Sequence, residues 1–469
     1  MKTNLPLQHL YWRAGFGPRP QDVAAGLSPR KALRQLFKDS ALNEPLAGPG
    51  LSYSEEEPGM MSPAEGMAPA KRSEFTPEQR KARNQAEREA YMNMSRAWME
   101  RMATSPAQLR EKMTLFWHGH FACRVRRPDA ALRLHNTTRK HALGKFPDLL
   151  LAVSQEPAML QFLNNQQNKK QHPNENFARE VMELFTLGRG NYTEADVKEA
   201  ARAFTGWAYD AAGNYQFRAR QHDDGEKTFL GQTGRFTGED VLRIILEQPP
   251  AATFLTTKLY RFLVNDVPNP AHIAPLAADF RRSGYDIAAL LENMLSADWF
   301  YEPANVGTRI KSPVELLAGI RRTLNVQIDN DQALLGIQKA LGQTLFMPPN
   351  VAGWPGGRSW IDSSSLLLRL QVPSVLFRDA DFAVTLKQDE DDIAPNLPRA
   401  ERKLDNRLKA HLPLAPLHTL LGEKPTTQQL SAFLLQTPLR PENLPLLEQH
   451  TELKDRLVAV LSLPEYQLA

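Results

Sequence analysis

The segment 174–188 carries the densest set of side chains able to do chemistry in this chain. It holds three carboxylates, Glu175, Glu180 and Glu183, together with Arg179. Its apolar residues repeat at helical spacing, namely Phe177, Val181, Leu184 and Phe185. This acidic segment therefore predicts one amphipathic helix whose polar face carries Glu180 and Glu183 one turn apart. Such a face could move protons or bind a cation, or it could be solvated and paired with Arg179.

A second candidate is His120, in the run Trp117-His118-Gly119-His120-Phe121. His120 continues an apolar stripe of helical period, which consists of Leu109, Met113, Phe116 and Trp117. The spacing predicts that His120 faces inward and that His118 faces away. A neutral imidazole serves as a metal ligand or a general base, and the alternative is a core histidine that donates to a backbone carbonyl.

His222 and Asp223 stand directly before an Asp-Gly pair, which is turn chemistry. They either close a polar turn or reach the same site as the glutamates. In the second case the catalytic set is His120, Glu175, Glu180, Glu183, His222 and Asp223. A divalent metal with oxygen and nitrogen ligands would be held by His120, Glu180, Glu183, His222 and Asp223. The spacing matches no established zinc pattern such as His-Glu-x-x-His.

Four further residues are candidates for binding a substrate. Arg139 and Arg179 could hold an anionic group. Trp354 and Trp360 lie in a glycine-rich loop and either stack on a flat ligand or lock that loop onto the core. The segment Arg309–Glu315 is interpreted as structural, because Ser312 is a helix cap and Pro313 suits the first helical turn.

Several of these motifs together resemble the bacterial domain-of-unknown-function 1800 family. The resemblance rests on Arg13-Ala14-Gly15-Phe16-Gly17, on 117–121, on the acidic segment, on His222-Asp223 and on 342–360, and it extends to about Arg369. It implies no activity, because that family has no settled biochemistry. Relatives are commonly encoded beside a sulfatase-like family of unknown function 1501, which makes such a protein a candidate partner. Asn164 stands where relatives usually show Asp, so any charged ligand at that position is in doubt.

Composition excludes several classes of protein. Among the 469 residues, 42% are hydrophobic and 23% are charged, and no apolar run is long enough to cross a bilayer. The net charge of 57 − 53 = +4 is too small and too dispersed for a nucleic-acid-binding face. Cys123 is the only cysteine, which excludes an intramolecular disulfide. The N-terminus lacks the apolar core of a signal peptide, so a cytoplasmic location is expected.

The pattern of helical periodicity and breakers predicts a mainly α, multi-helical body over residues 5–370. We expect a disordered insertion at 45–75, a short β-hairpin within 209–230 and a small helical C-terminal region at 380–469. Two functional classes remain. One is a hydrolase or transferase with a polar, metal-dependent site, and the other is a non-catalytic helical assembly or cargo-binding protein that works with the sulfatase-like partner. An open cleft would favour the enzyme, and a dry, fully paired network would favour the second class.

Overall fold

The computed structural model describes residues 4–48, 76–210, 212–328, 332–378 and 410–469. The described chain is mainly α-helical, as the sequence predicts. The predicted insertion at 45–75 falls outside the described residues except for 45–48, where Leu46 is buried and its N–H donates to the side chain of Asn136 at 2.8 Å.

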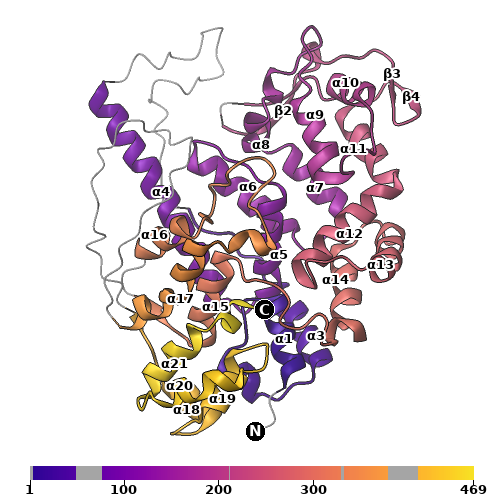
Figure 1. The fold of residues 1–469 in the computed structure, drawn as a ribbon. Helices are drawn as coiled ribbons and strands as arrows, with labels where there is room; N and C mark the ends of the chain where they lie inside the picture. The colour runs from indigo at the N-terminus through magenta and orange to yellow at the C-terminus, as the bar shows by residue number, and fades with distance from the viewer. Residues whose placement is uncertain (1–3, 49–75, 211, 329–331, 379–409) are drawn as a thin grey trace.

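Figure 1 shows α5 near the middle of the view, with the C-terminus also near the middle and the N-terminus at the lower edge. The helices are α1 (Leu5–Ala14), α2 (Pro20–Ala24), α3 (Pro29–Asp39), α4 (Pro77–Thr104), α5 (Gln108–His120), α6 (Pro128–His141), α7 (Phe146–Ser154), α8 (Pro157–Phe162), α9 (Asn176–Glu180), α10 (Glu194–Ala203), α11 (Gly238–Glu247), α12 (Pro249–Leu263), α13 (Pro270–Arg282), α14 (Ile287–Ser296), α15 (Pro313–Thr323), α16 (Gln332–Ala340), α17 (Ser363–Phe377), α18 (Ala415–Leu421), α19 (Thr427–Leu434), α20 (Leu444–Glu448) and α21 (Leu453–Leu461).

Helix α5 is buried along almost its whole length. Every residue from Gln108 to Trp117 is buried, although three consecutive side chains in it, Arg110, Glu111 and Lys112, are charged. A helix buried on all faces must supply partners for such charges inside the protein, because an unpaired charge in the interior is costly. The charged residues of α5 therefore organise much of the interior around them.

The acidic segment forms a helix that changes its winding halfway. Helix α9 passes directly into the π-helix η3 (Val181–Thr186). The N–H of Leu187 donates to the carbonyl of Met182, five residues earlier, at 2.8 Å. The predicted apolar stripe is buried at Phe177, Val181 and Phe185. The helix ends at this wide turn, which leaves its last carbonyls available to side chains from other helices.

The hairpin predicted within 209–230 forms two residues earlier, from Trp207 to Phe217, and a second hairpin extends past the predicted range to Gly234. Strand β1 (Trp207–Tyr209) pairs antiparallel with β2 (Tyr215–Phe217), with Ala208 opposite Gln216. Strand β3 (Lys227–Phe229) pairs with β4 (Gln232–Gly234). A third small pair joins β5 (Gln327–Ile328) to β6 (Ala410–His411).

The C-terminal helices α18–α21 share the core of the rest of the protein. Their buried side chains belong to the same hydrophobic cluster as those of α1 and α5. The ring of Tyr466 meets the ring of Trp12 edge-on at 6.2 Å, and Leu468 forms a β-bridge with Ile310. The predicted domain boundary between 370 and 380 stays a prediction, but these helices do not form a core of their own.

Candidate functional site

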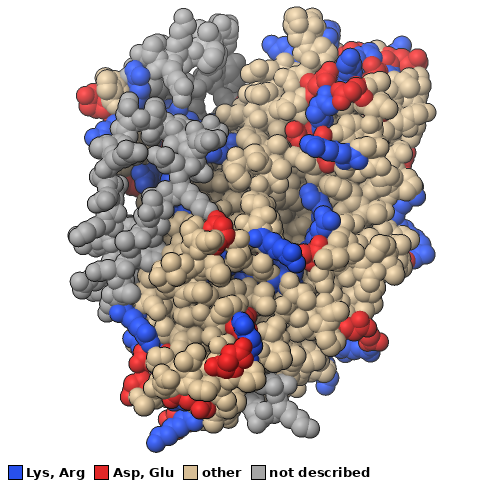
Figure 2. All heavy atoms as spheres, in the orientation of Figure 1, with Lys and Arg blue, Asp and Glu red and all other residues tan. Residues whose placement is uncertain are grey.

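The acidic segment pairs with its immediate neighbours on the surface. Arg179 contacts Glu175 at 3.0 Å and Glu194 of α10 at 2.7 Å, rather than Glu183 as its spacing suggests. Glu183 instead accepts hydrogen bonds from Arg189 at 2.5 Å and from the hydroxyl of Tyr192 at 2.8 Å. Figure 2 shows acidic and basic side chains intermixed over α9 and α10. This network is a paired and solvated face.

Glu180 differs from the other acids of this face. Its side chain is half-buried, and within the described residues it makes no hydrogen bond of its own. Burial, and then the neighbouring carboxylate of Glu183, raise the pKa of Glu180. The hydrogen bonds from Arg189 and Tyr192 lower the pKa of Glu183. Two carboxylates with oppositely shifted pKa values therefore stand one turn apart.

His120 is buried and both of its ring nitrogens are occupied. Nε2 donates to the carbonyl of Phe185 at 3.0 Å, and Nδ1 accepts from Nζ of Lys258 at 3.1 Å. Burial and the Lys258 ammonium lower the pKa of His120, so the ring is neutral at pH 7. The inward orientation is confirmed, and the geometry is that of a core histidine that donates to a backbone carbonyl. No ring nitrogen is left to bind a metal.

His222 and Asp223 form the polar turn that was one of their two interpretations. Nδ1 of the buried His222 lies 2.9 Å from the carbonyl of Thr205. The carboxylate of Asp223 accepts two hydrogen bonds from Arg202, at 2.7 and 3.2 Å, and one from the N–H of Gly225. The Arg202 guanidinium holds the pKa of Asp223 below its usual value. This acid is committed to closing the turn against α10.

The two histidines lie at opposite ends of the acidic segment. His120 contacts the C-terminal end of this segment at the carbonyl of Phe185. The turn that holds His222 lies near the N-terminal end. There the N–H of Gly206 donates to the carbonyl of Asn168, and the side chain of Asn168 accepts the N–H of Asn174. Helix α9 and most of η3 lie between these two ends. Among the described residues, no group of three or more His, Cys, Asp and Glu side chains is arranged to hold a metal ion. The predicted divalent-metal site gains no support from this arrangement.

Three of the predicted substrate-binding residues, Arg139, Trp354 and Trp360, pack against other parts of the protein. Arg139 is 2% exposed and donates two hydrogen bonds to Glu111, at 2.9 and 2.6 Å. Trp360 is buried, and the ring of Trp354 lies 5.3 Å from that of His118. Gly353 has a φ of +84°, and a Cβ there would stand 2.3 Å from the carbonyl oxygen of Gly119. The glycine-rich loop that carries Trp354 and Trp360 thus packs directly against the end of α5.

Asn164 occupies a turn and not a ligand position. It is exposed, with φ of 58° and ψ of 21°, and its carbonyl accepts the N–H of Gln167. Asparagine tolerates this left-handed conformation better than most residues. The amide that replaces the acid of relatives therefore suits the local backbone.

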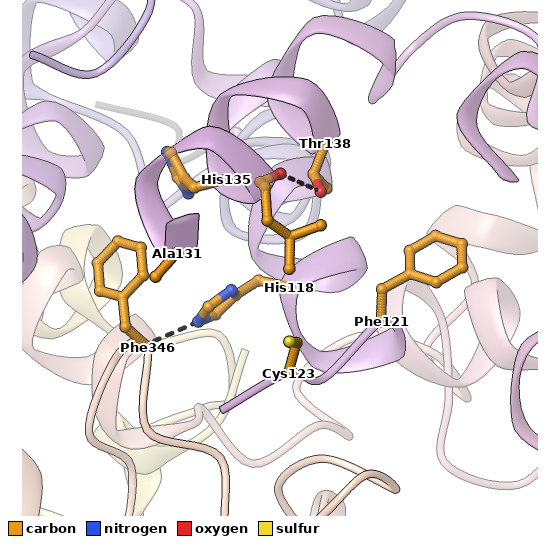
Figure 3. Close-up of a pocket in the computed structure, with 8 residues that line it drawn as sticks. His118, Phe121, Cys123, Ala131, His135, Thr138 and Phe346 are labelled. Atoms are coloured by element: carbon orange, nitrogen blue, oxygen red, sulfur yellow. Dashed lines mark hydrogen bonds between the residues drawn. The ribbon is translucent and has the colours of Figure 1, made fainter. Parts of the chain in front are cut away.

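His118 borders a small enclosed cavity with Cys123 and His135 (Figure 3). Nε2 of His118 accepts the N–H of Phe346 at 3.0 Å, and burial lowers the pKa of His118 to about 3. The cavity volume is about 10 Å³, which is the space for one water molecule. A substrate does not fit there.

The chain also buries a cluster of basic side chains that sequence reasoning missed. This basic centre consists of Arg13, Lys112, Arg309, Lys311 and Arg369 around one carboxylate, Glu315. All six side chains are buried. Lys112 forms a short ion pair with Oε1 of Glu315, and Arg309 lies 3.6 Å from the same oxygen. Oε2 accepts the N–H of Ser312 at 2.8 Å. The pairing with Lys112 and Arg309 holds the pKa of Glu315 well below its usual value against the effect of burial.

Two lysines of the basic centre have shifted pKa values. Burial lowers the pKa of Lys112 to about 8. Nζ of Lys311 lies between the rings of Trp12 and Tyr466, at 3.7 and 3.8 Å from their centroids, and donates to the carbonyl of Tyr466. Burial lowers the pKa of Lys311 well below its usual value. Lys311 therefore acts as a packed amine, whereas Lys112 carries a charge that Glu315 balances.

Several guanidinium nitrogens of the basic centre have no partner. Arg13 uses one terminal nitrogen for the carbonyl of Asn305, at 2.8 Å, and for the hydroxyl of Thr308. Its Nε and other terminal nitrogen are buried without a hydrogen bond, as are Nε of Arg309 and Nε of Arg369. Buried donors of this kind usually bind a water or an ion.

Comparison with known families matches residues 9–468 to the family described as protein of unknown function DUF1800. The chain belongs to that family. The match continues through the C-terminal helices, so the expectation that the family likeness fades after about Arg369 is wrong. No curated protein matches the chain. No solved structure matches it.

Part of the basic centre was visible in this DUF1800 sequence. Arg13 opens the first family motif, and Lys311 and Glu315 lie in the segment that was interpreted only as a helix start. That interpretation is confirmed, because Ser312 and Glu315 form a capping box. Glu315 has both roles, since one oxygen caps the helix and the other meets Lys112. The available signal was the charge of Lys112 within an otherwise buried helix.

A larger open cavity of about 660 Å³ lies between α2, the end of α4, the end of α15 and the start of α18. It is lined by polar and apolar side chains, among them Arg19, Glu100, Arg321, Gln327 and Pro416. An ion pair between Arg321 and Glu100 closes one wall. None of the predicted site residues lines it. Within the described chain, no helix has the length and apolar character to cross a membrane.

Proposed function

We propose that this protein is a non-catalytic binding protein that holds an anionic ligand at the basic centre. One observation carries the proposal: buried guanidinium donors of Arg13 and Arg309 have no partner, while Glu315 is the only carboxylate in the cluster. Uncompensated positive charge in the interior is costly, and an anion would offset it with charge-assisted hydrogen bonds. A ligand with negative charge is the simplest partner for such donors.

The arrangement of the predicted acids and imidazoles supports a binding role over metal-dependent hydrolysis or transfer. Glu175, Glu183 and Asp223 are each committed to an arginine. His120 and His222 are committed to backbone carbonyls. General acid–base catalysis needs groups that reach a shared substrate, and these groups have separate local partners. None of these side chains lines the open cavity between α2 and α18, which is where a cleft of the enzyme class would be sought in the described chain.

Isothermal titration with inorganic phosphate, in a buffer that contains no other multivalent anion, tests the proposal. We expect saturable binding to the wild-type protein and at least tenfold weaker binding to Arg309→Gln. The matched control is Arg243→Gln, because Arg243 is 54% exposed and pairs with Glu247 on the surface of α11. Binding that is absent from the wild type, or equal in Arg309→Gln and Arg243→Gln, would refute the proposal.

One observation favours an enzyme as a second candidate. Nζ of Lys258 donates to Nδ1 of His120 and to the carbonyl of Leu184, both at 3.1 Å, and its side chain is partly exposed. Burial lowers the pKa of Lys258 to about 8. Lysines with such a pKa act as bases or nucleophiles in enzymes. Labelling with trinitrobenzenesulfonate at pH 8 should then modify Lys258 faster than exposed Lys198, and equal or slower labelling would remove this candidate.

The sulfatase-like partner of family 1501 stays a prediction, as do a divalent-metal cofactor and a hydrolase or transferase activity. Nothing in the described surface identifies a partner by its charge or shape. Co-purification of the two proteins, compared with a mixture in which the partner is replaced by an unrelated sulfatase, would test the association.

A further inference from the structure

We infer that the ligand group bound at the basic centre is a tetrahedral dianion of the phosphate or sulfate class, and not a carboxylate. The inference rests on the proposed anion-binding function and specifies its chemistry. It follows from the separate elements that supply the basic side chains, from their charge and from the way Glu315 already uses its two oxygens.

The basic side chains reach the centre from separate elements. Arg13 comes from the end of α1, Lys112 from the middle of α5, and Arg309 from the segment that precedes α15. Lys112 and Arg309 meet at one oxygen of Glu315, and, after burial, the charge of Arg309 lowers the pKa of Arg13. Donors that converge from three elements suit an acceptor with oxygens in three directions. A tetrahedral oxyanion has this shape, whereas a carboxylate presents its two oxygens in one plane.

The carboxylate of Glu315 already accepts hydrogen bonds within the basic centre. Its two oxygens accept from Lys112 and the N–H of Ser312, with Arg309 within ion-pair distance. Even so, Nε of Arg309 and two nitrogens of Arg13 remain without a partner. One carboxylate is therefore insufficient for the donors present.

The charge of the basic centre also favours a dianion. Arg13, Arg309, Arg369 and Lys112 contribute four positive charges at pH 7, and Glu315 and Asp266, which acts on Arg13, contribute two negative charges, which leaves 4 − 2 = +2. Lys311 is not counted, because burial lowers its pKa well below the usual value. The three arginines stay protonated in proteins, so their charges cannot be shed. A monoanion would leave +1 and a dianion 0, and the smaller residual charge is preferred in a poorly solvated interior.

The basic centre lies beneath a partly exposed boundary. The guanidinium of Arg309 sits 5.0 Å from the ring centroid of Phe262, and the Phe262 side chain is partly exposed. Asp266, also partly exposed, raises the pKa of Arg13 against the effect of burial. Figure 2 shows a hollow near the middle of this face, with basic side chains at its edge, between α12 and the loop that precedes α17. An anion from solvent would enter past Phe262 and Asp266.

Titration of the wild-type protein with four anions at one pH and one ionic strength tests the inference. We expect inorganic phosphate and sulfate to bind at least tenfold more tightly than acetate and formate. Equal affinity for acetate and phosphate would overturn the tetrahedral class while the proposed anion-binding function stands. Binding of none of the four would overturn both, and would assign the unpartnered donors to buried water.

Arg309→Lys sharpens the result, because it keeps the charge and removes the planar donor fork. We expect this variant to lose most of its preference for phosphate over acetate, while Arg243→Lys on the surface keeps the full preference. An unchanged preference in Arg309→Lys would show that Arg309 does not contact the anion and would overturn its role. If Arg309→Lys does not fold, the wild-type series decides the inference by itself.

Discussion

Arg179 of the acidic segment and Arg309 of the basic centre each meet a glutamate, yet 32% of the Arg179 side chain and only 7% of the Arg309 side chain is exposed. Water screens the first pair, and each partner could separate at small cost. The second pair is largely shielded from solvent, so the loss of one partner leaves a buried charge. The comparison shows that similar sequence signals differ in their consequences according to burial. The acidic segment has the higher density of charge in the sequence, whereas loss of a charged partner is expected to cost more free energy of unfolding in the basic centre.

The largest effect is expected from Glu315→Gln. This change removes the only carboxylate of the basic centre and leaves Lys112 and Arg309 without a counter-charge, so we expect a loss of about 3–5 kcal/mol in the free energy of unfolding. Urea unfolding at pH 7 measures it. If Glu315→Gln lowers the free energy of unfolding by less than Glu183→Gln does, the acidic segment and not the basic centre carries the larger effect.

The pH dependence of the same residue has a definite sign. The pKa of Glu315 is lowered in the folded protein, so its contribution is fully present above its unfolded pKa and is lost only as the pH falls toward the lower folded value. The titration of Glu315 should therefore add no pH dependence to the stability difference between wild type and Glu315→Gln from pH 6 to 7, which lies below the pKa of about 8 of Lys112. Added phosphate should raise the melting temperature of the wild type if the basic centre holds an anion.

Lys258 is expected to produce an intermediate effect that depends on pH. Its pKa is about 8 in the folded protein and 10.5 ordinarily, so between these values the unfolded chain binds more protons and stability rises with pH. We expect Lys258→Met to remove about 1–2 kcal/mol of this rise, since partial exposure reduces the full effect. Unfolding curves from pH 7 to 10.5 measure it. A parallel pH profile in the variant would show that Lys258 keeps its ordinary pKa.

A smaller effect of opposite sign is expected from Glu180→Gln. Burial and Glu183 raise the pKa of Glu180, so the charged form is disfavoured at pH 7 and its removal should stabilise the protein by about 0.5 kcal/mol. The gain should vanish as the pH falls below the unfolded pKa, where Glu180 is protonated in both states. Stoichiometric metal that is present in the purified wild type and lost in Glu180→Gln would instead restore the metal-site hypothesis.

Arg179→Gln should have the smallest effect. Its partners Glu175 and Glu194 are 38% and 69% exposed, so we expect a change below about 0.5 kcal/mol that disappears in 1 M salt. Thermal unfolding at low and high salt measures it. A loss that approaches that of Glu315→Gln would show that the acidic segment is a tightly coupled network.

Local elements of this fold were accessible from the sequence. The helix cap at Ser312 was identified, and α15 starts there as expected. The inward orientation of His120 followed from the helical period of its neighbours. These features depend on residues three to five positions apart, for which helix geometry specifies which side chains share a face. The change to a π-helix at Val181 was not anticipated, because it depends on carbonyls that bind His120 and Lys258 from other helices.

The partners of each charged side chain were not accessible in the same way. Arg179 had three acids within helical reach or close by, and only the packing of α10 against α9 decided that it binds Glu194. Arg139 was taken for a substrate-binding residue, but the fold buries it against Glu111. Sequence spacing constrains neighbours along a helix, and it does not constrain which helices meet.

The sequence by itself determined the helical fold class, the family, the positions of most helices and the inward face of α5. Only the tertiary structure decided that the acidic segment is solvated and that Arg13, Lys112, Arg309 and Glu315 meet in the interior. The physical reason is that local periodicity depends on backbone geometry within a few residues, whereas burial depends on contacts between distant segments. Lys112 and Glu315 are 203 residues apart, and their ion pair exists only because α5 and α15 pack together.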